Sequence, residues 1–239
     1  ADPKVALTEL RERIKTDDAL LRSCHALIHE IGQASYKKYG DFAEAMKYQD
    51  EICNSAYLHG VIEAHFENSE DVFIDMKTVC ASYPIGKFLS WECYHGIGHG
   101  LMYYTSNDLP ESLNACDQYE NKFARSSCAN GVFMENFNAD QKLHISEFLD
   151  ADNPLYPCDE QKALHKPDCY LYAPTYYLNL HNNDYTGALA WCRNAPSPYT
   201  TTCIEGVGNQ TMKENINDPK YVEAICMNGD SGVRDACIR

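Results

Sequence analysis

The sequence contains no apolar run of about 18 residues, the length at which a helix can span a bilayer. Basic residues are also scarce, because 20 Lys and Arg stand against 35 Asp and Glu and the formal net charge is −15. Nucleic-acid backbones and anionic membrane surfaces attract basic proteins, so an acidic chain is a poor partner for either. We therefore expect no nucleic-acid partner and no transmembrane segment.

Motifs that mark several enzyme classes are missing as well. The chain has no Gly-x-Ser-x-Gly elbow, no phosphate-binding loop and no dinucleotide fingerprint. The stretch from His29 to Gln33 is similar to the zinc-protease motif His-Glu-x-x-His, but Gln33 stands where the second histidine belongs. No Cys-x2-Cys zinc knuckle occurs either. The sequence therefore gives no support to the reactions that depend on these motifs.

Cysteine, by contrast, is abundant. Twelve cysteines, an even number spread over all 239 residues, are rare in the reducing cytosol and common in exported proteins. We predict six disulfides and a secreted or otherwise extracytoplasmic protein. The chain begins Ala1-Asp2-Pro3 without a methionine, which predicts a processed or engineered start. Asn209-Gln210-Thr211 is an acceptor sequon, so Asn209 is a candidate glycosylation site and the protein a candidate glycoprotein.

The cysteines recur at a regular interval. Cys93, Cys128, Cys169, Cys203 and Cys237 are separated by 35, 41, 34 and 34 residues, a period typical of helix-turn-helix repeats. In three units an Asn-Asp pair precedes the first cysteine, with eight residues from Asp to Cys, and suits the N-cap of a helix. Each unit thus predicts a cap, a short helix A that ends at a first cysteine, a loop, and a helix B that a second cysteine opens.

The spacing also predicts how the cysteines pair. Ten to twelve residues separate the two cysteines of each of five units, which suits a disulfide that closes a helical hairpin. Cys53 has no partner in its own unit, so Cys24 is the one candidate that remains for it. The predicted pairs are Cys24–Cys53, Cys80–Cys93, Cys116–Cys128, Cys158–Cys169, Cys192–Cys203 and Cys226–Cys237.

The N-terminal residues 1–40 depart from the repeat and predict helices of their own. Val5 to about Leu21 predicts one amphipathic helix, and Cys24 to about Tyr39 a first helix B. Asp41 to Cys53 then predicts a helix A and Asn54 to about Phe66 a helix B, with Tyr57 where the second cysteine of this unit is expected. About five to six helix A/helix B units therefore fill residues 41–239.

Together these patterns predict an all-α fold, in which disulfide-stapled helical-hairpin repeats form a short α-solenoid and a single domain over residues 1–239. From Asp41 to Cys237 the architecture resembles Sel1-like and tetratricopeptide-type repeats, specifically the cysteine-rich secreted versions in which a disulfide closes each hairpin. The resemblance implies an α-solenoid. It does not extend to the Leu-Gly and Gly-x-Gly-Val landmarks of Sel1 units, which are absent.

Three of the predicted B helices contain a pair of metal-ligating residues. Such pairs lie four residues apart, and positions i and i+4 share one helix face, so both side chains can reach one ion. Neighbouring B helices of a solenoid lie side by side, about 10 Å apart, which brings equivalent positions together. We predict a divalent metal site, with zinc favoured over iron, manganese or copper. Its predicted ligands are His25, His29, His59, His95 and His99.

Three carboxylates near these histidines are candidates for catalysis. Glu63 completes the pair that begins at His59, Glu30 follows His29, and Glu135 lies on the next predicted B helix. Each could orient a ligand or act as a general base towards water on the ion. On this interpretation the protein is a metal-dependent hydrolase or oxidase.

The histidines also allow a structural interpretation. Histidine pairs on helices are often a matter of packing, and a histidine at a helix start can satisfy backbone groups of the neighbouring unit. The chain would then be a non-catalytic scaffold that binds a protein, peptide, glycan or small molecule in its concave groove, with tyrosines such as Tyr103 and Tyr172 at the contact. Haem bound through histidine and tyrosine is a further alternative.

Overall fold

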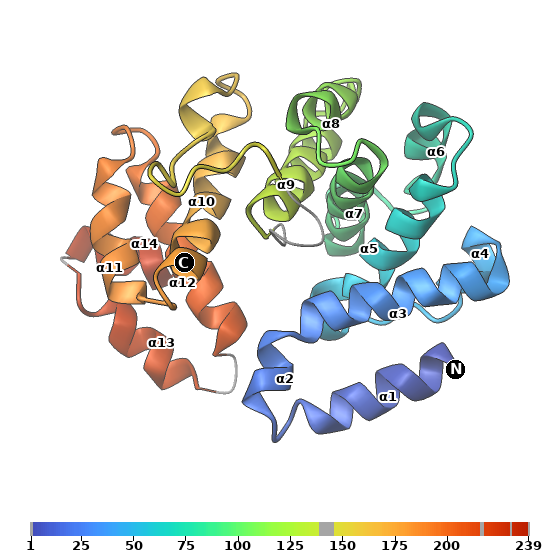
Figure 1. Ribbon diagram of the computed structural model, residues 1–239, viewed down its shortest axis with the longest axis horizontal. Coiled ribbons are helices and arrows are strands. Elements are labelled where there is room, and N and C mark those ends of the chain that lie inside the picture. The colour runs from blue at the N-terminus through green and yellow to red at the C-terminus, as the bar shows by residue number, and fades with distance from the viewer. Residues whose placement is uncertain (1, 139–145, 216–217, 230, 239) are drawn as a thin grey trace. The chain divides into compact units, whose positions relative to one another are not determined.

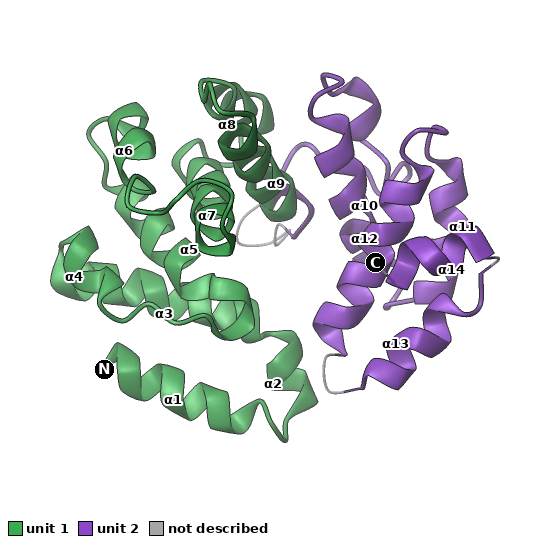
Figure 2. Ribbon diagram, turned by 180° about the vertical axis from the view of Figure 1, so that it is seen from behind, with its two compact units in different colours: residues 1–135 green, residues 136–239 purple. Residues whose placement is uncertain are grey.

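The computed structural model describes residues 2–138, 146–215, 218–229 and 231–238, and within these ranges the chain is helical, with no strand. The all-α prediction is thereby confirmed for these residues, while the solenoid stays a prediction. Residue contacts group the chain into two compact units, where the sequence predicts one domain (Figure 2). Unit 1 is Ala1–Glu135 and unit 2 is Asn136–Arg239, and each is described by itself.

Long helices alternate with short ones in unit 1 (Figure 1). The long helices correspond to the predicted B helices and the short ones between them to the A helices. Their order along the chain is α1 (Pro3–Arg13), α2 (Asp18–Arg22), α3 (Cys24–Tyr39), α4 (Phe42–Met46), α5 (Ile52–Glu67), α6 (Val72–Thr78), α7 (Phe88–Tyr104), α8 (Leu109–Cys116) and α9 (Lys122–Asn138), and the boundary with unit 2 falls within α9.

The predicted single helix from Val5 to Leu21 is wrong, because two helices occupy this stretch. α1 ends at Arg13, and α2 begins after Asp17. The backbone of Asp17 is extended, and its carboxylate accepts a hydrogen bond from the amide of Leu20 at 2.9 Å. A capping side chain of this kind starts a new helix in place of a continued one.

In unit 2 the long helices α10 and α12 are again separated by a short helix, and two helices of eight residues follow. Asp184 and Asp218 cap its short helices through their carboxylates, as Asp108 does in unit 1, so the Asn-Asp signal of the sequence is borne out. The elements are a 3₁₀ turn (Cys158–Glu160), α10 (Lys166–Leu180), α11 (Tyr185–Trp191), a second 3₁₀ turn (Cys192–Asn194), α12 (Thr200–Glu214), α13 (Pro219–Cys226) and α14 (Ser231–Ile238).

Six disulfides join the twelve cysteines in the predicted pairs, and none is free. Five close a local hairpin across 11 to 13 positions, whereas Cys24–Cys53 spans 29. The second cysteine does not open helix B as predicted. Cys93 lies one turn or more inside α7, and Cys237 lies near the end of α14.

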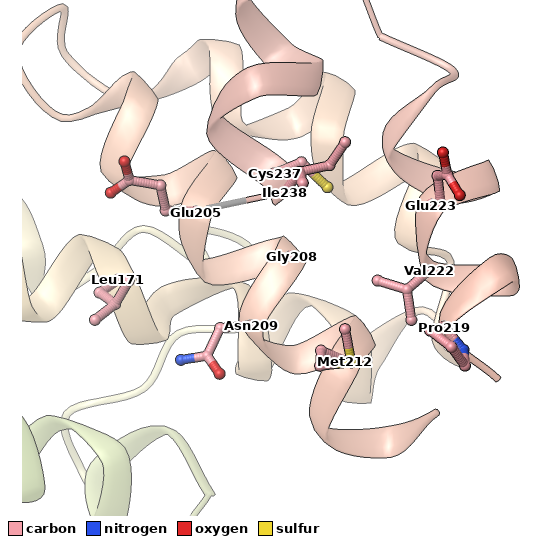
Figure 3. A pocket seen from close by; sticks show the side chains of 10 residues that line it. All are labelled: Leu171, Glu205, Gly208, Asn209, Met212, Pro219, Val222, Glu223, Cys237 and Ile238. Atoms are coloured by element: carbon pink, nitrogen blue, oxygen red, sulfur yellow. The ribbon is translucent and has the colours of Figure 1, made fainter. Parts of the chain in front are cut away.

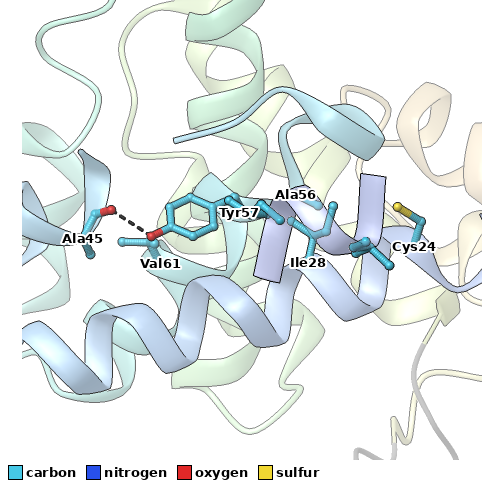
Figure 4. Close-up of a cluster of buried hydrophobic side chains, with 8 residues drawn as sticks. Cys24, Ile28, Ala45, Ala56, Tyr57 and Val61 are labelled. Carbon is cyan, nitrogen blue, oxygen red and sulfur yellow. Dashed lines mark hydrogen bonds between the residues drawn. The ribbon is translucent and has the colours of Figure 1, made fainter. Parts of the chain in front are cut away.

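Tyr57 takes the place of the cysteine that the α4–α5 hairpin lacks. Its hydroxyl donates a hydrogen bond to the carbonyl of Ala45 on α4 at 2.8 Å (Figure 4) and lies 2.6 Å from the hydroxyl of Ser35 on α3. The ring is fully buried in a cluster that includes Ile28 and Val61. Burial raises the pKa of Tyr57 to about 12, so the phenol stays a neutral donor. A hydrogen bond thus joins this hairpin where a disulfide joins the others.

Neighbouring long helices approach each other at backbone distance. A Cβ placed on Gly60 of α5 would lie 2.0 Å from the carbonyl oxygen of His29 on α3. A Cβ placed on Gly131 of α9 would likewise lie 1.9 Å from the carbonyl oxygen of His95 on α7. Only glycine permits these contacts, and the Gly60 contact fixes the distance between α3 and α5, which present predicted metal ligands.

None of the helices in the described ranges combines the length and the apolar character that crossing a bilayer requires. This agrees with the lack of long apolar runs in the sequence.

Candidate metal centre

Three neighbouring helices of unit 1 present the predicted ligands. Helix α5 packs against α3 on one side and against α7 on the other. Each helix presents two ligating side chains that are one turn apart and point into the same interior region: His25 and His29 on α3, His59 and Glu63 on α5, and His95 and His99 on α7.

The five imidazole rings form one contiguous cluster with His59 at its centre. The centroid of the His59 ring lies between 5.2 and 5.5 Å from the centroids of the other four rings. Ligand atoms of His25, His59 and His99 lie within 4.8 Å of one another, and so do those of His29, Glu63 and His99. The structure therefore brings together all five predicted histidines and Glu63.

Every ring of the cluster has one nitrogen within 3.1 Å of an oxygen acceptor. Such a nitrogen must be protonated to donate, so the other nitrogen of a neutral ring has the lone pair. The anchors are His25 Nδ1 to the Cys53 carbonyl at 2.8 Å, His29 Nδ1 to Glu63 Oε1 at 2.6 Å, His59 Nε2 to Glu92 Oε2 at 3.1 Å, His95 Nδ1 to Asn130 Oδ1 at 3.0 Å, and His99 Nδ1 to Glu135 Oε2 at 2.7 Å. Protein metal sites use the same device to fix the tautomer of their histidines.

The remaining nitrogens face one another at short distance. Nε2 of His25 lies 3.0 Å from Nε2 of His29, and Nε2 of His95 lies 3.1 Å from Nε2 of His99. Where both facing nitrogens have lone pairs they repel at this distance, so in these tautomers each contact favours a cation, either an extra proton that makes one ring an imidazolium or a metal ion. Nδ1 of His59 is buried without a hydrogen-bond partner, which is costly for an acceptor that has no ion beside it.

Around His59 and His99 the surroundings disfavour an extra proton. Burial lowers the pKa of His59, although the Glu92 carboxylate opposes the shift. Burial also lowers the pKa of His99, well below its usual range, and positive charge on His95 or His29 would lower it further. Both rings are therefore neutral near pH 7, which is the form that binds metal.

An ionised carboxylate lies inside the same cluster. Burial raises the pKa of Glu63, but His29 and a 2.8 Å hydrogen bond from the Gln33 amide outweigh burial, and the pKa is lowered. The described contacts of Glu63 are with these two residues, and neither has a fixed positive charge. A buried anion without lysine or arginine beside it is a favourable place for a metal cation.

A strained turn helps to orient His25. Cys53, Asn54 and Ser55 at the start of α5 have φ values of 50°, 60° and 51°, in the left-handed region that non-glycine residues rarely adopt. The carbonyl of Cys53 in this turn is the acceptor for His25 Nδ1, and Cys53 is also bonded to Cys24, the neighbour of His25. Strain of this kind often accompanies functional sites.

Two of the three predicted catalytic carboxylates belong to the cluster. Glu63 contacts His29, and Glu135 on α9 contacts His99. Glu30 is exposed and lines a surface hollow beside α1, together with Leu27 and Lys38, so it does not join the other two. No contact of Glu30 with the cluster supports a catalytic role.

Several residues around the cluster were not singled out by the motif search. Glu92 immediately precedes Cys93 and belongs to no motif, and Gln33 counted only as a missing histidine. The repeat spacing does indicate Asn130 and Met134, because it aligns them with His95 and His99 of the preceding long helix. Tyr103, half-buried on α7, hydrogen-bonds Gln33, and burial together with the nearby Glu63 raises its pKa.

Unit 2 has a cavity where unit 1 has the histidines. A Cβ placed on Gly206 of α12 would lie 2.0 Å from the carbonyl oxygen of Leu171 on α10, which makes this helix pair equivalent to α7–α9 and Leu171 equivalent to His95. Counting from these contacts, Glu205 and Asn209 are equivalent to Asn130 and Met134. Leu171, Glu205 and Asn209 line a cavity of about 790 Å³, whose other walls come from α13 and α14 (Figure 3).

Comparisons with protein-family models, with curated proteins and with solved structures found no match to this chain.

Proposed function

We propose that this protein is an extracytoplasmic metal-binding protein, and that its histidine cluster binds a divalent ion, with zinc favoured. The observation that supports this most directly is the pair of 3.0 and 3.1 Å contacts between histidine Nε2 atoms whose Nδ1 atoms are already anchored. Zinc binds histidine nitrogen at about 2.0 to 2.1 Å, which places two ligand nitrogens about 2.8 to 3.4 Å apart for angles between 90° and 109°. The separations in the cluster fall in this range.

The dense packing of the rings also favours an ion over a larger group. Ring centroids in direct contact lie 4.6 Å apart for His25 and His29 and 4.9 Å apart for His95 and His99. A planar macrocycle would have to separate rings that now touch, so a single ion is a better fit than haem. The cysteines are all paired and are not competing ligands.

The extracytoplasmic part of the proposal is supported by the disulfides. Six disulfides in one chain are unusual in a reducing compartment and usual outside it. Glycosylation of Asn209 fits the same location, and its side chain is exposed on α12.

If the ion is catalytic, metal-assisted hydrolysis or oxidation is the reaction class that the site would serve. Glu135 is then the better placed proton acceptor, because its side chain is 13% exposed whereas that of Glu63 is fully buried. A substrate would reach the cluster beside His25, the least buried of the five histidines.

Elemental analysis of protein purified without chelator or metal-affinity resin tests the proposal. We expect about one or two equivalents of metal in the wild type and at least a hundredfold weaker binding in the His95→Ala/His99→Ala variant. The matched control is His65→Ala/His181→Ala, which removes two histidines outside the cluster and should keep the metal. Absence of metal in the wild type, even after incubation with zinc, iron, manganese and copper salts, would contradict the proposal.

A second candidate function rests on the unit 2 cavity, whose walls include Leu171, Val222 and Ile238. An apolar cavity with a few polar groups at its edge is typical of a small-molecule or peptide site. Binding of an apolar fluorescent probe should be weakened by Met212→Arg, which changes a cavity residue, and unchanged by Met227→Arg, which changes another exposed methionine outside the cavity. Equal binding by both variants would count against this second function.

A further inference from the structure

A methionine sulfur lies against one edge of the histidine cluster. Sδ of Met134 on α9 is 3.2 Å from Nε2 of His95, a close polar contact between α9 and α7. In the tautomer in which Nδ1 of His95 donates to Asn130, Nε2 has a lone pair, and a thioether sulfur also offers only lone pairs. As with the facing nitrogens, two electron-rich atoms at this distance favour a cation between or beside them.

Three donor atoms therefore meet at this edge. Nε2 of His95 lies 3.1 Å from Nε2 of His99 and 3.2 Å from the sulfur of Met134. All three side chains are buried, with Met134 at 7% exposure, so they are shielded from water. Two imidazoles with one thioether make a softer donor set than imidazoles with carboxylates.

The two helix pairs of unit 1 differ at this position. The glycine contacts make His29 and Glu63 on α3 and α5 the equivalents of His95 and Met134 on α7 and α9. Between α3 and α5, His29 lies 2.6 Å from the Glu63 carboxylate. Between α7 and α9, the histidine contacts the thioether of Met134 instead. One end of the cluster thus has a hard oxygen donor and the other a soft sulfur donor.

We propose that His95, His99 and Met134 form a copper(I) subsite at the α7–α9 end of the cluster. This inference rests on the proposed function, namely that the cluster binds metal at all. Thioether ligands select copper(I) over zinc, because the soft ion gains more from the polarisable sulfur. The carboxylate end, with Glu63, retains the preference for a divalent ion.

The test compares copper(I) and zinc(II) affinities of the full chain after metal has been removed by dialysis against chelator. Copper(I) is maintained with ascorbate, which leaves the disulfides intact, and its affinity is measured by competition with a chromophoric copper(I) chelator. Met134→Leu should weaken copper(I) binding at least tenfold and change zinc(II) binding less than twofold. The control Met102→Leu removes another fully buried sulfur, on α7, and should change neither.

Copper K-edge absorption of the copper(I)-loaded wild type gives a measurement that does not depend on any variant. We expect sulfur scattering at about 2.3 Å, absent from the Met134→Leu protein. Copper without sulfur scattering, or equal copper(I) affinity in the wild type and Met134→Leu, overturns the subsite while leaving the proposed function intact. A wild-type protein that binds neither ion overturns both.

Discussion

The helix pairs α7–α9 of unit 1 and α10–α12 of unit 2 share one backbone contact but differ in the side chains around it. In both, a glycine of the second helix meets a carbonyl of the first, His95 in one and Leu171 in the other. In both, a disulfide joins the second helix to the end of the short helix that precedes it in the chain. The histidines occur in unit 1 alone among these positions, so helix packing does not require them.

The equivalent polar contact shows how the chemistry differs. His99 and Glu135 of unit 1 are replaced in unit 2 by Thr175 and Gln210, which hydrogen-bond each other while both are buried. In a neutral hydroxyl–amide pair the two side chains are hydrogen-bond partners of each other. In a histidine–carboxylate pair the second ring nitrogen still has a lone pair that can bind a proton or a metal ion. Unit 2 therefore serves as an internal reference for what the fold needs without metal ligands.

The largest effect should come from filling the shared glycine contact. Gly60→Ala and Gly206→Ala each place a methyl group 2.0 Å from a carbonyl oxygen. Alanine normally favours a helix by about 1 kcal/mol, but here we expect a loss of about 3 kcal/mol in the free energy of unfolding, because the helices must separate. Denaturant unfolding measures this loss.

Metal binding should separate the two glycine variants. Gly60→Ala should also weaken metal binding, since it moves α5 away from α3, and Gly206→Ala should not. Equal metal affinity in the two variants would mean that the histidine cluster does not depend on the α3–α5 distance.

Metal saturation should stabilise unit 1 and leave unit 2 unchanged. An ion at a hundred times its dissociation constant stabilises the folded form by about 2.7 kcal/mol. Native-state hydrogen exchange should therefore slow for amides of α3, α5 and α7, with no change in α10 or α12. Equal slowing in both units would show that the metal acts outside the cluster.

Replacing an anchoring carboxylate should have a smaller effect. Glu92→Gln retains the size of the side chain but offers His59 Nε2 only a neutral acceptor. We expect metal affinity to fall about tenfold, in the lower part of the range for changes behind a metal ligand. The control Glu67→Gln alters an exposed carboxylate of the same helix as His59 and should have no effect; isothermal titration of metal into the metal-free variants compares them.

The smallest effect should come from the hydrogen bond that takes the place of a disulfide. Tyr57→Phe leaves the Ala45 carbonyl without this donor, and we expect a loss of about 1 kcal/mol in unfolding free energy. A disulfide closing a loop of this size contributes about 3 kcal/mol in the chain-entropy model. The conservative control is Tyr221→Phe, at an exposed tyrosine, and a loss near 3 kcal/mol for Tyr57→Phe would contradict this ranking.

Much of this architecture can be predicted from the sequence, because it depends on local features. Cysteine pairs at ten to twelve intervening residues and caps such as Asp108 are local features, and they predict the hairpins and the disulfides that the structure contains. The convergence of the histidines follows from two periods, four residues along a helix and about 34 between helices. The structure brings these residues together, while the ion that they bind stays a proposal.

What the sequence does not reveal depends on contacts between distant residues. Glu92 anchors His59 across 33 positions, and no spacing rule singles it out. The left-handed turn begins at Cys53, whose disulfide partner Cys24 lies 29 positions away, and local propensity does not predict it. The break between α1 and α2 had a signal in Asp17, which the apolar periodicity of Val5 to Leu21 obscured.

The five short disulfides also determine how the molecule should respond to mechanical load. Each of them joins positions only 11 to 13 apart, so it prevents one hairpin from being extended but does not tie that hairpin to the next. In unit 1 an ion held by α3, α5 and α7 would supply that missing tie, because its ligands come from three successive hairpins. Pulled from its ends, unit 2 should yield one hairpin at a time at low force, and metal-loaded unit 1 should resist as a block until the ion is lost.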